Sequence, residues 1–342
     1  MNKENRPAEA AGKKTKKRGK GLRVFLCVLL VLALFLTVVN LLPPKKVAES
    51  NPFLKAPDAL PMIAAHRGGG LSNPENTLMA FRAAVNDFGI QICETDLWMT
   101  ADGHLVYSHD ASINRMACPE EAEPVRIAEH TLAELRAYNM GYNFRDRDTG
   151  EYPYRDLTED EQLALGLKIL EFHELLEEFY DSRKDLLFIV EIKNGGEVGF
   201  EAARIIDRAL TERFPDYKGN LVVGTFHPEI ETDLKENHPG LMRGASTAGA
   251  AGFILTQLLR VNYFSDADFS CLQIPMAYTL KGVRLDLTRQ SYIDRAHRRD
   301  IAVQYWTIND EEDMRFLIER GVDAIMTDDP LLLKRVLEDY GA

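Results

Sequence analysis

Short apolar runs alternate with amphipathic helical patterns along most of this chain, and that alternation limits its fold more than any other feature. Runs such as "MIAAH" (62–66), "LLFIVEIK" (186–193) and "DAIMT" (323–327) are typical of buried strands. Apolar residues spaced by three and four, as in 77–88, indicate helices between them. About eight such repeats over roughly 250 residues predict a closed parallel barrel of the (β/α)₈, or TIM, type within residues 61–342.

The predicted elements do not match eight repeats perfectly. The strand candidates are 62–66, 90–98, 104–109, 186–193, 221–226, 241–245, 270–275, 302–306 and 323–327. The predicted helices include 77–88, 171–180, 198–214, 228–237, 291–299 and 311–320. Nine strand candidates compete for eight places, so either one strand lies outside the barrel or one assignment is wrong. The link from Trp98 to His104 is too short for a crossover helix and favours a hairpin.

A mostly polar stretch interrupts the repeating pattern after the 104–109 run. It contains "EYPYRDLTEDEQ" and extends over about 111–168. Its composition predicts a small insertion into the barrel.

The N-terminal region contains a second strong signal. Nineteen residues from Val24 to Leu42 include only Thr37 and Asn40 as polar side chains. As a helix they would rise about 28 Å, close to the roughly 30 Å of a bilayer core. We therefore expect a transmembrane helix at 24–42, followed by a linker at 43–60; a cleaved signal peptide and a buried core helix are the alternatives.

The distribution of charge gives this helix a direction. Residues 1–42 hold 9 Lys/Arg and 2 Asp/Glu, which leaves 32 of the 41 basic and 51 of the 53 acidic side chains in the remaining 300 residues. The basic cluster precedes the apolar run, so the positive-inside tendency places the tail, 1–23, in the cytoplasm and the acidic domain, 61–342, outside the cell membrane. A body this acidic argues against nucleic acid as a partner.

Charged side chains follow or interrupt several of the predicted strands. His66 and Arg67 end the first strand in "HRGGG", where the glycines permit close backbone approach to a ligand. Glu94 and Asp96 lie two apart in an apolar run, so both leave the same face of a strand. Two buried carboxylates are costly unless a cation or strong donors compensate them.

Other strand ends supply further candidates for the same mouth of the barrel. They are His109, the pair Glu191 and Lys193 in "FIVEIKNGG", Trp306, and the acids of "TDDP". Trp306 has two interpretations, packing or substrate contact. Because reactive groups of such barrels gather at the carboxyl ends of the strands, these side chains are expected to converge.

The three acids Glu94, Asp96 and Glu191 form an oxygen-rich set that suits Ca²⁺ or Mg²⁺ better than zinc. A divalent cation beside Arg67 and Lys193 would attract a phosphate group. Two histidines, His66 and His109, could exchange protons with the attacking and the departing oxygen. The chemistry implied is the cleavage of a phosphodiester.

These segments resemble a known family. "AHRGG", "PENT", "ETDLWMTADGHLVYSHD", "EIK", "YWTIND" and "GVDAIMTDDP" are similar, in order, to the signature segments of glycerophosphodiester phosphodiesterases, from about Met62 to Leu333. The resemblance implies a TIM barrel with an insertion and a Ca²⁺ or Mg²⁺ ion on Glu94, Asp96 and Glu191. It also implies the following roles: His66 and His109 as acid and base, Arg67 and Lys193 on phosphate, and Glu75 close to the site.

The expected reaction is hydrolysis of glycerophosphodiesters to glycerol 3-phosphate and an alcohol, through either water or a neighbouring glycerol hydroxyl. Three alternatives remain open: a lysophospholipase D acting on lysophospholipids, a hydrolase of glycerophosphate surface polymers, and a non-catalytic receptor for polyol phosphates. Apolar residues in 274–282 either form a wall for acyl chains or pack in the barrel. The oligomeric state is not determined by the sequence.

Overall fold

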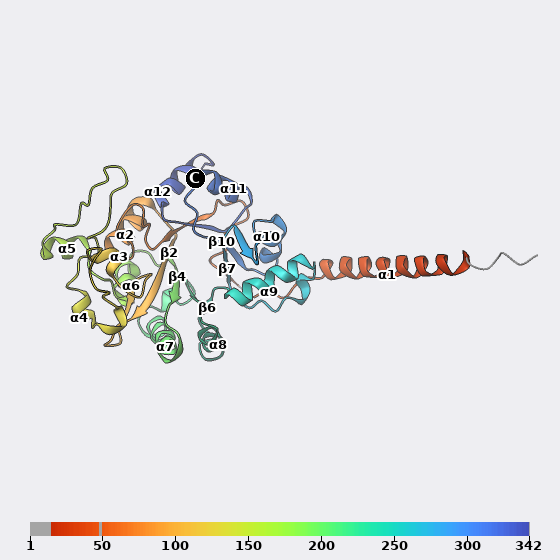
Figure 1. Cartoon of the computed structure of the whole chain (residues 1–342), viewed down its shortest axis with the longest axis horizontal. Coiled ribbons are helices and arrows are strands. Elements are labelled where there is room, and N and C mark those ends of the chain that lie inside the picture. The colour runs from red at the N-terminus through yellow and green to blue at the C-terminus, as the bar shows by residue number, and fades with distance from the viewer. Residues whose placement is uncertain (1–14, 48–49, 342) are drawn as a thin grey trace, which may run out of the picture.

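The computed structural model describes residues 15–47 and 50–341, and its main body is a barrel (Figure 1). Within residues 50–341, eight parallel strands form the barrel: β1 (Met62–His66), β2 (Ile92–Met99), β4 (Leu187–Ile192), β5 (Leu221–Thr225), β6 (Met242–Arg243), β7 (Cys271–Ile274), β10 (Ala302–Tyr305) and β11 (Ala324–Thr327). Their order is β6-β5-β4-β2-β1-β11-β10-β7, and a parallel bridge from Gly244 to Cys271 joins the two ends. The predicted barrel is confirmed.

Helices surround this barrel on its outer face, as Figure 1 shows. They are α2 (Leu78–Ala83) with the π-helical turn η1 (Ala84–Phe88), α6 (Phe172–Tyr180), α7 (Gly196–Glu212), α8 (Pro228–Asn237), α9 (Thr247–Leu258), α10 (Gln290–His297), α11 (Glu311–Glu319) and α12 (Pro330–Glu338). Single 3₁₀ turns, η3 (Pro215–Tyr217) and η4 (Asn262–Phe264), precede β5 and β7. Apolar side chains of strands and helices together form one large core.

The ninth strand candidate lies outside the barrel. It forms β3 (Leu105–Tyr107), which pairs antiparallel with the far end of β2 through Trp98 and Val106. The connection between β2 and β3 has no room for a crossover helix, so the chain can only turn back on itself. His109 therefore reaches the carboxyl end of the barrel from a hairpin and not from a barrel strand.

The polar segment predicted as an insertion forms a small layer of short helices beside β3 (Figure 1). Its elements are α3 (Asn114–Ala117), η2 (Ile127–Glu129), α4 (Leu132–Leu135) and α5 (Glu159–Leu165). Side chains of α3, η2 and α4 contribute to a separate apolar cluster that includes Val106, Ile113, Leu135 and Ile169, whereas α5 buries no side chain. The insertion thus brings its own core and leaves the barrel packing intact.

A second hairpin, which the sequence patterns did not predict, follows β7. Its strands β8 (Ala277–Leu280) and β9 (Val283–Asp286) pair antiparallel and stand apart from the barrel sheet. Tyr278, Leu280 and Val283 leave more than half of their surface exposed. Within 274–282, Ile274 and Met276 pack against the barrel core, whereas Tyr278 and Leu280 do not.

The amino end of the barrel is closed by residues that the sequence assigned to the linker. Phe53 is completely buried among Ala64, Ile92 and other residues of the lower barrel interior. Asn51 donates from Nδ2 to the carbonyl oxygens of Ser270 and Asp300, at 2.8 and 2.9 Å. This part of the 43–60 segment is consequently built into the barrel.

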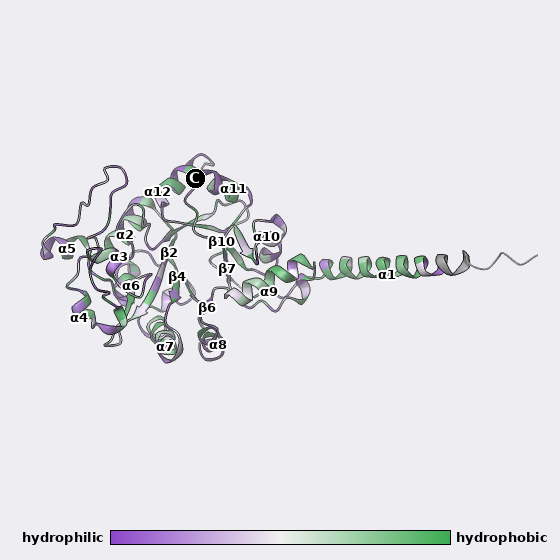
Figure 2. Ribbon diagram, viewed as in Figure 1, coloured by the Kyte–Doolittle hydropathy of each residue, from purple (hydrophilic) through white to green (hydrophobic). Residues whose placement is uncertain are grey.

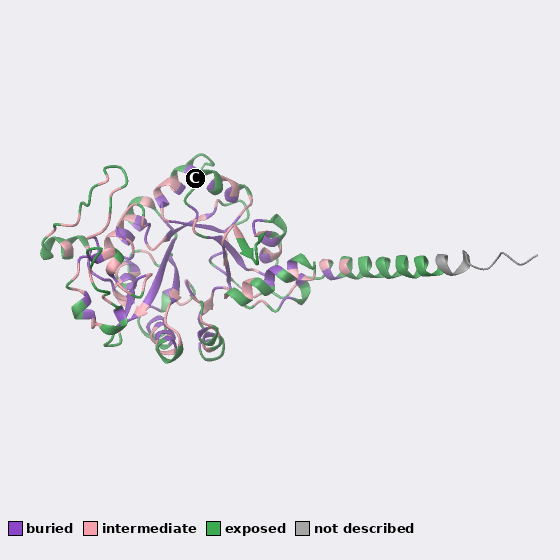
Figure 3. Cartoon of the chain, viewed as in Figure 1, coloured by how far each residue is buried: buried purple, intermediate pink, exposed green. Residues whose placement is uncertain are grey.

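On the N-terminal side of Asn51 and Phe53, the helix α1 (Thr15–Leu41) extends from the body of the protein (Figure 1). Its apolar part is the 22-residue stretch Lys20–Leu41, long and apolar enough to cross a membrane. Figure 2 shows this helix as hydrophobic and Figure 3 shows it as exposed. The described helix also includes residues that we assigned to the basic tail, while residues 1–14 of that tail lie outside the described part of the chain.

Candidate active site

The first strand ends in a tight turn that shapes one side of the site. Arg67 has a left-handed backbone conformation (φ 55°), and its amide donates to the Glu94 carbonyl oxygen at 3.0 Å and to the Glu94 carboxylate at 3.1 Å. Gly68 and Gly69 continue the turn with positive φ. A Cβ on Gly69 would lie 2.8 Å from the Pro330 ring, so the close approach of this turn to α12 requires glycine.

His66, at the end of β1, is held by an aspartate from the last strand. Its Nδ1 lies 2.6 Å from Oδ1 of Asp328, whose Oδ2 accepts from Asn309 Nδ2 at 2.8 Å. Because an ionised carboxylate can only accept a hydrogen bond, Nδ1 carries the proton, and Nε2 remains available to accept or donate a proton. Burial of the ring opposes its charged form, but the carboxylates of Glu94 and Asp328 outweigh this and raise the pKa of His66.

The three predicted metal ligands lie on adjacent strands. Asp96 of β2 is the register partner of Glu191 of β4, and Glu94 lies two residues before Asp96 on the same face. Lys193 Nζ connects two of them, at 2.9 Å from Asp96 Oδ1 and 2.8 Å from Glu191 Oε1. Arg67 Nε approaches Asp96 Oδ2 at 3.6 Å. The structure thus brings Glu94, Asp96, Glu191, Arg67 and Lys193 together.

Burial makes these carboxylates costly to ionise. It raises the pKa of Glu94 to about 7, and the neighbouring Asp96 carboxylate adds to that rise. It also raises the pKa of Glu191, against the effect of Lys193. Lys193 is itself mostly buried, yet the Asp96 and Glu191 carboxylates raise its pKa and keep it charged. The cluster therefore favours any additional positive charge.

The residues present fit a divalent cation by chemistry. Asp96 Oδ2 is buried and has no hydrogen-bond partner within the described residues, although it faces a charged side chain. Carboxylate oxygens are the donors that Ca²⁺ and Mg²⁺ prefer. As the side chains stand, no three His, Cys, Asp or Glu groups in the described part of the chain form a closed metal cluster. Lys193 occupies the position between Asp96 and Glu191.

The second histidine is oriented by a chain of ion pairs that reaches back to Arg67. His109 Nδ1 lies 2.9 Å from Asp110 Oδ1, and Asp110 Oδ2 accepts from Arg115 Nε at 2.7 Å. Arg115 Nη1 then donates to Glu75 Oε2 at 3.0 Å, and Glu75 Oε1 lies 3.4 Å from Arg67 Nη1. Glu75 is thus paired with two arginines, Arg67 and Arg115.

Both histidines therefore share one arrangement, in which an aspartate holds Nδ1 and leaves Nε2 available. Trp306 directly follows β10 and is partly exposed, and no side-chain hydrogen bond joins it to the other predicted residues in the described structure. Its two interpretations both stand.

Sequence reasoning did not predict the contacts that Asp328, Asn309 and Arg115 make with the site. The acids of "TDDP" were noted at a strand end, but their pairing with His66 depends on β1 and β11 being neighbours in the barrel. Arg115 lies in α3 of the insertion, where no periodicity connects it to Glu75. No sequence signal could have found this contact.

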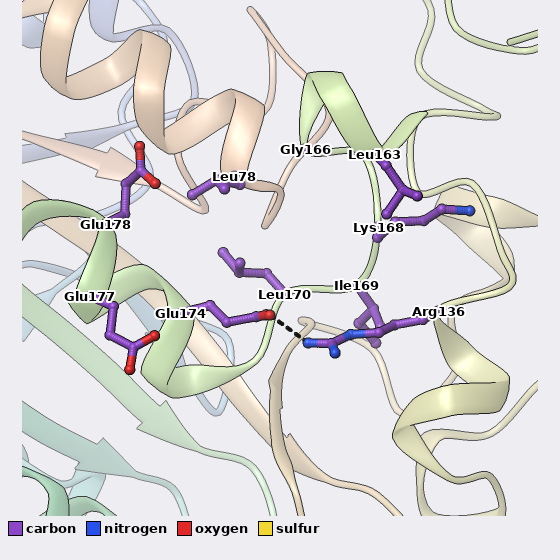
Figure 4. Close-up of a pocket in the computed structure, with 10 residues that line it drawn as sticks. All are labelled: Leu78, Arg136, Leu163, Gly166, Lys168, Ile169, Leu170, Glu174, Glu177 and Glu178. Atoms are coloured by element: carbon purple, nitrogen blue, oxygen red, sulfur yellow. Dashed lines mark hydrogen bonds and ion pairs between the residues drawn. The ribbon is translucent and has the colours of Figure 1, made fainter. Parts of the chain in front are cut away.

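A separate surface pocket of about 580 Å³ lies between α2, α6 and the insertion (Figure 4). Three glutamates line it, and each is paired with an arginine: Glu174 with Arg136, Glu177 with Arg213 and Glu178 with Arg82. None of the predicted site residues lines this pocket. Its charges are already compensated, so the pocket adds nothing to the chemistry of the barrel mouth.

The fold and the site together define a parallel (β/α)₈ barrel whose mouth holds two histidines, each with Nδ1 on an aspartate, and a cluster of three carboxylates. The sequence profile described as "Glycerophosphoryl diester phosphodiesterase family" matches residues 66–332, which is most of the chain. The chain belongs to this family, as its signature segments predicted.

Individual relatives agree with this assignment. A glycerophosphodiester phosphodiesterase of Caldanaerobacter subterraneus subsp. tengcongensis is 27% identical over 282 residues, which cover 82% of this chain and 99% of the relative. The glycerophosphoryl diester phosphodiesterase domain of a Mycobacterium tuberculosis protein has the same fold, with a TM-score of 0.64 at 18% identity, over 81% of this chain and 99% of that one.

A phosphodiesterase from Oleispira antarctica, solved in complex with its product sn-glycerol-3-phosphate, also shares the fold. Its TM-score is 0.59 at 21% identity, and the match covers 82% of this chain and 97% of that one.

Replacement of Asp328 by Asn is expected to lower the pKa of His66, because the substitution removes the negative charge beside Nδ1 while it keeps the size of the side chain. The measurement is the titration of the His66 ring by NMR in excess chelator, with the resonance assigned from its loss in His66→Gln. Asp233→Asn, in which the altered carboxylate faces His238, is the matched control. An unchanged His66 titration in Asp328→Asn would contradict this role.

Proposed function

We propose that this protein hydrolyses glycerophosphodiesters to glycerol 3-phosphate and an alcohol. The observation that carries the proposal is the pair of histidines, each with Nδ1 on an aspartate, together with an acidic cluster that contains two largely buried cations. Membership of the glycerophosphoryl diester phosphodiesterase family supports the same reaction.

In this mechanism Arg67 and Lys193 attract the phosphate of the substrate, because both are positive, buried groups with geometry fixed by Asp96. Nε2 of one histidine accepts the proton of the attacking oxygen, and Nε2 of the other protonates the departing alcohol. The aspartates keep each ring in the tautomer that this exchange needs. Attack by water and attack by the neighbouring glycerol hydroxyl both satisfy this arrangement.

Glu94, Asp96 and Glu191 would hold the divalent cation, Ca²⁺ or Mg²⁺, that the charge of this cluster favours. When bound, such an ion neutralises negative charge on the phosphate oxygens.

We also propose that α1 is an uncleaved membrane span, with the N-terminus in the cytoplasm and the barrel outside the cell membrane. The apolar length of Lys20–Leu41 supports a span. Contacts between the end of α1 and the barrel support its retention, since Arg298 donates to the carbonyl oxygens of Asn40 and Leu42 at 3.0 Å each.

Substitution of His66 or His109 by Ala is expected to lower kcat for glycerophosphocholine by about 10² or more, because a general acid or base typically contributes about 10² to 10⁴. The circular dichroism spectrum should not change, since both rings lie at the mouth and not in the core. His130→Ala, which alters an exposed hydrogen bond in the insertion, is the control and should retain full activity. Full activity in either site variant would refute the acid/base assignment.

Addition of Ca²⁺ or Mg²⁺ after chelation is expected to restore activity and to raise the Tm of the wild-type chain. A ligand at a concentration of about 100 times its Kd stabilises a folded protein by about 2.7 kcal/mol. At this chain length that free energy corresponds to a rise in Tm of several degrees. Asp96→Asn should lose the cation-induced rise in Tm, whereas Asp233→Asn should keep it. Equal rises in both variants would place the ion elsewhere.

Protease added to intact cells that produce the full chain is expected to degrade the barrel, as detected with an antibody against residues 61–342. Cells lysed before the treatment provide the control for protease sensitivity. Complete protection of the barrel in intact cells, with degradation after lysis, would overturn the proposed orientation.

A further inference from the structure

Exposed apolar side chains gather where α1 meets the barrel. They belong to the C-terminal end of α9, the residue after it and η4, and we call them the anchor-side patch: Leu255, Leu258, Leu259, Tyr263 and Phe264. Each leaves between 43% and 58% of its surface exposed. Apolar side chains grouped in this way on a protein surface mark a contact with another apolar body.

The patch touches the apolar part of α1 itself. The ring of Phe264 stacks on that of Phe35, with centroids 6.4 Å apart and planes 17° apart. Nearer the end of the helix, Asn40 Nδ2 donates to the Arg260 carbonyl oxygen at 2.6 Å. Figure 1 shows α9 beside the point where α1 leaves the body, and Figure 3 shows much of α9 exposed.

These two contacts determine the level of the anchor-side patch along α1. Asn40 and Phe35 are five residues apart, so along a helix they differ by about 7.5 Å. The inference rests on the proposed membrane span: whatever depth Phe35 has in the bilayer, Phe264 shares it. Helices that lie in a membrane interface bury their apolar face by a similar depth of about 5 to 10 Å.

Basic side chains lie at the level expected for lipid headgroups. Lys45, Lys46, Arg260 and Arg298 are exposed around the last turn of α1, although Lys46 also pairs with Asp300. Burial and the nearby charges of Arg260 and Arg298 lower the pKa of Arg295, which indicates that these cations crowd one another. A basic group of this kind in an acidic body is suited to anionic headgroups.

We propose that the anchor-side patch inserts into the lipid leaflet next to α1, with its apolar side chains at the boundary of the acyl chains and with Lys45, Arg260 and Arg298 among anionic headgroups. A single span would leave the barrel free to turn about its attachment. This second contact fixes which side of the barrel faces the membrane. Because η4 precedes β7, the patch lies toward the amino ends of the strands, away from His66 and His109.

The experiment uses the full chain in vesicles of equal parts phosphatidylglycerol and phosphatidylcholine. Cys27→Ser leaves three cysteines, all buried, so that a single new cysteine can carry the fluorophore nitrobenzoxadiazole. The labelled positions are Leu259→Cys and Phe264→Cys in the patch, Leu30→Cys in α1, and Phe226→Cys, an exposed side chain directly after β5. A nitroxide on the lipid acyl chain quenches labels that lie in the bilayer.

The expected result is strong quenching at Leu259, Phe264 and Leu30, with none at Phe226. Quenching at Leu30 alone overturns the patch and leaves the span and the enzyme intact. Absence of quenching at Leu30 overturns the span, and the patch with it. If the label at Leu259 is blue-shifted but not quenched, then protein and not lipid covers the patch. That protein would be a second copy of the chain or another partner, and this result also overturns the proposal. Catalysis is not measured, so these results are independent of the proposed reaction.

Discussion

Compensation of buried negative charge is the constraint on which the rest of this structure depends. Asp96 is almost fully buried within β2, and its two carboxylate oxygens face Lys193 and Arg67. Without these cations the acids on β2 and β4 would repel each other in a medium of low dielectric constant. The same compensation is incomplete, because burial still raises the pKa of Glu94 and of Glu191. Because the negative charge of this site is not fully neutralised, the site favours an additional positive charge, such as a divalent cation.

The two histidines are oriented in the same way, by aspartates from different parts of the chain. His66 depends on Asp328, contributed by the last strand, and His109 depends on Asp110, which the insertion fixes through Arg115. The contact of Arg115 with Glu75 joins this network to Arg67. The insertion thus has a positional role at the mouth in addition to its own small core.

The end of the barrel opposite the site is organised for attachment. Phe53 fills the lower interior, Asn51 binds carbonyl oxygens ahead of β7 and β10, and Arg298 holds the last carbonyls of α1. The proposed active site therefore lies at the carboxyl ends of the barrel strands, and the contacts with α1 lie at their amino ends. Hydrogen bonds of Asn40 and Arg298 join the end of α1 to the barrel, and the Phe53 ring is completely buried inside it.

The sequence by itself determined the barrel, the apolar N-terminal helix, the family and the residues of the acid cluster, because each of these depends on local periodicity or on short motifs. It left nine strand candidates for eight places. Only the structure excluded 104–109 from the barrel, since strand partners are set by packing and not by propensity.

Tertiary structure also decided the partners of the functional side chains. Asp328 meets His66 because β11 and β1 are neighbours, Lys193 lies between Asp96 and Glu191 because β2 and β4 are in register, and Arg115 reaches Glu75 across a loop without periodicity. Contacts between residues far apart in the chain arise from the closure of the barrel, and no local pattern encodes them.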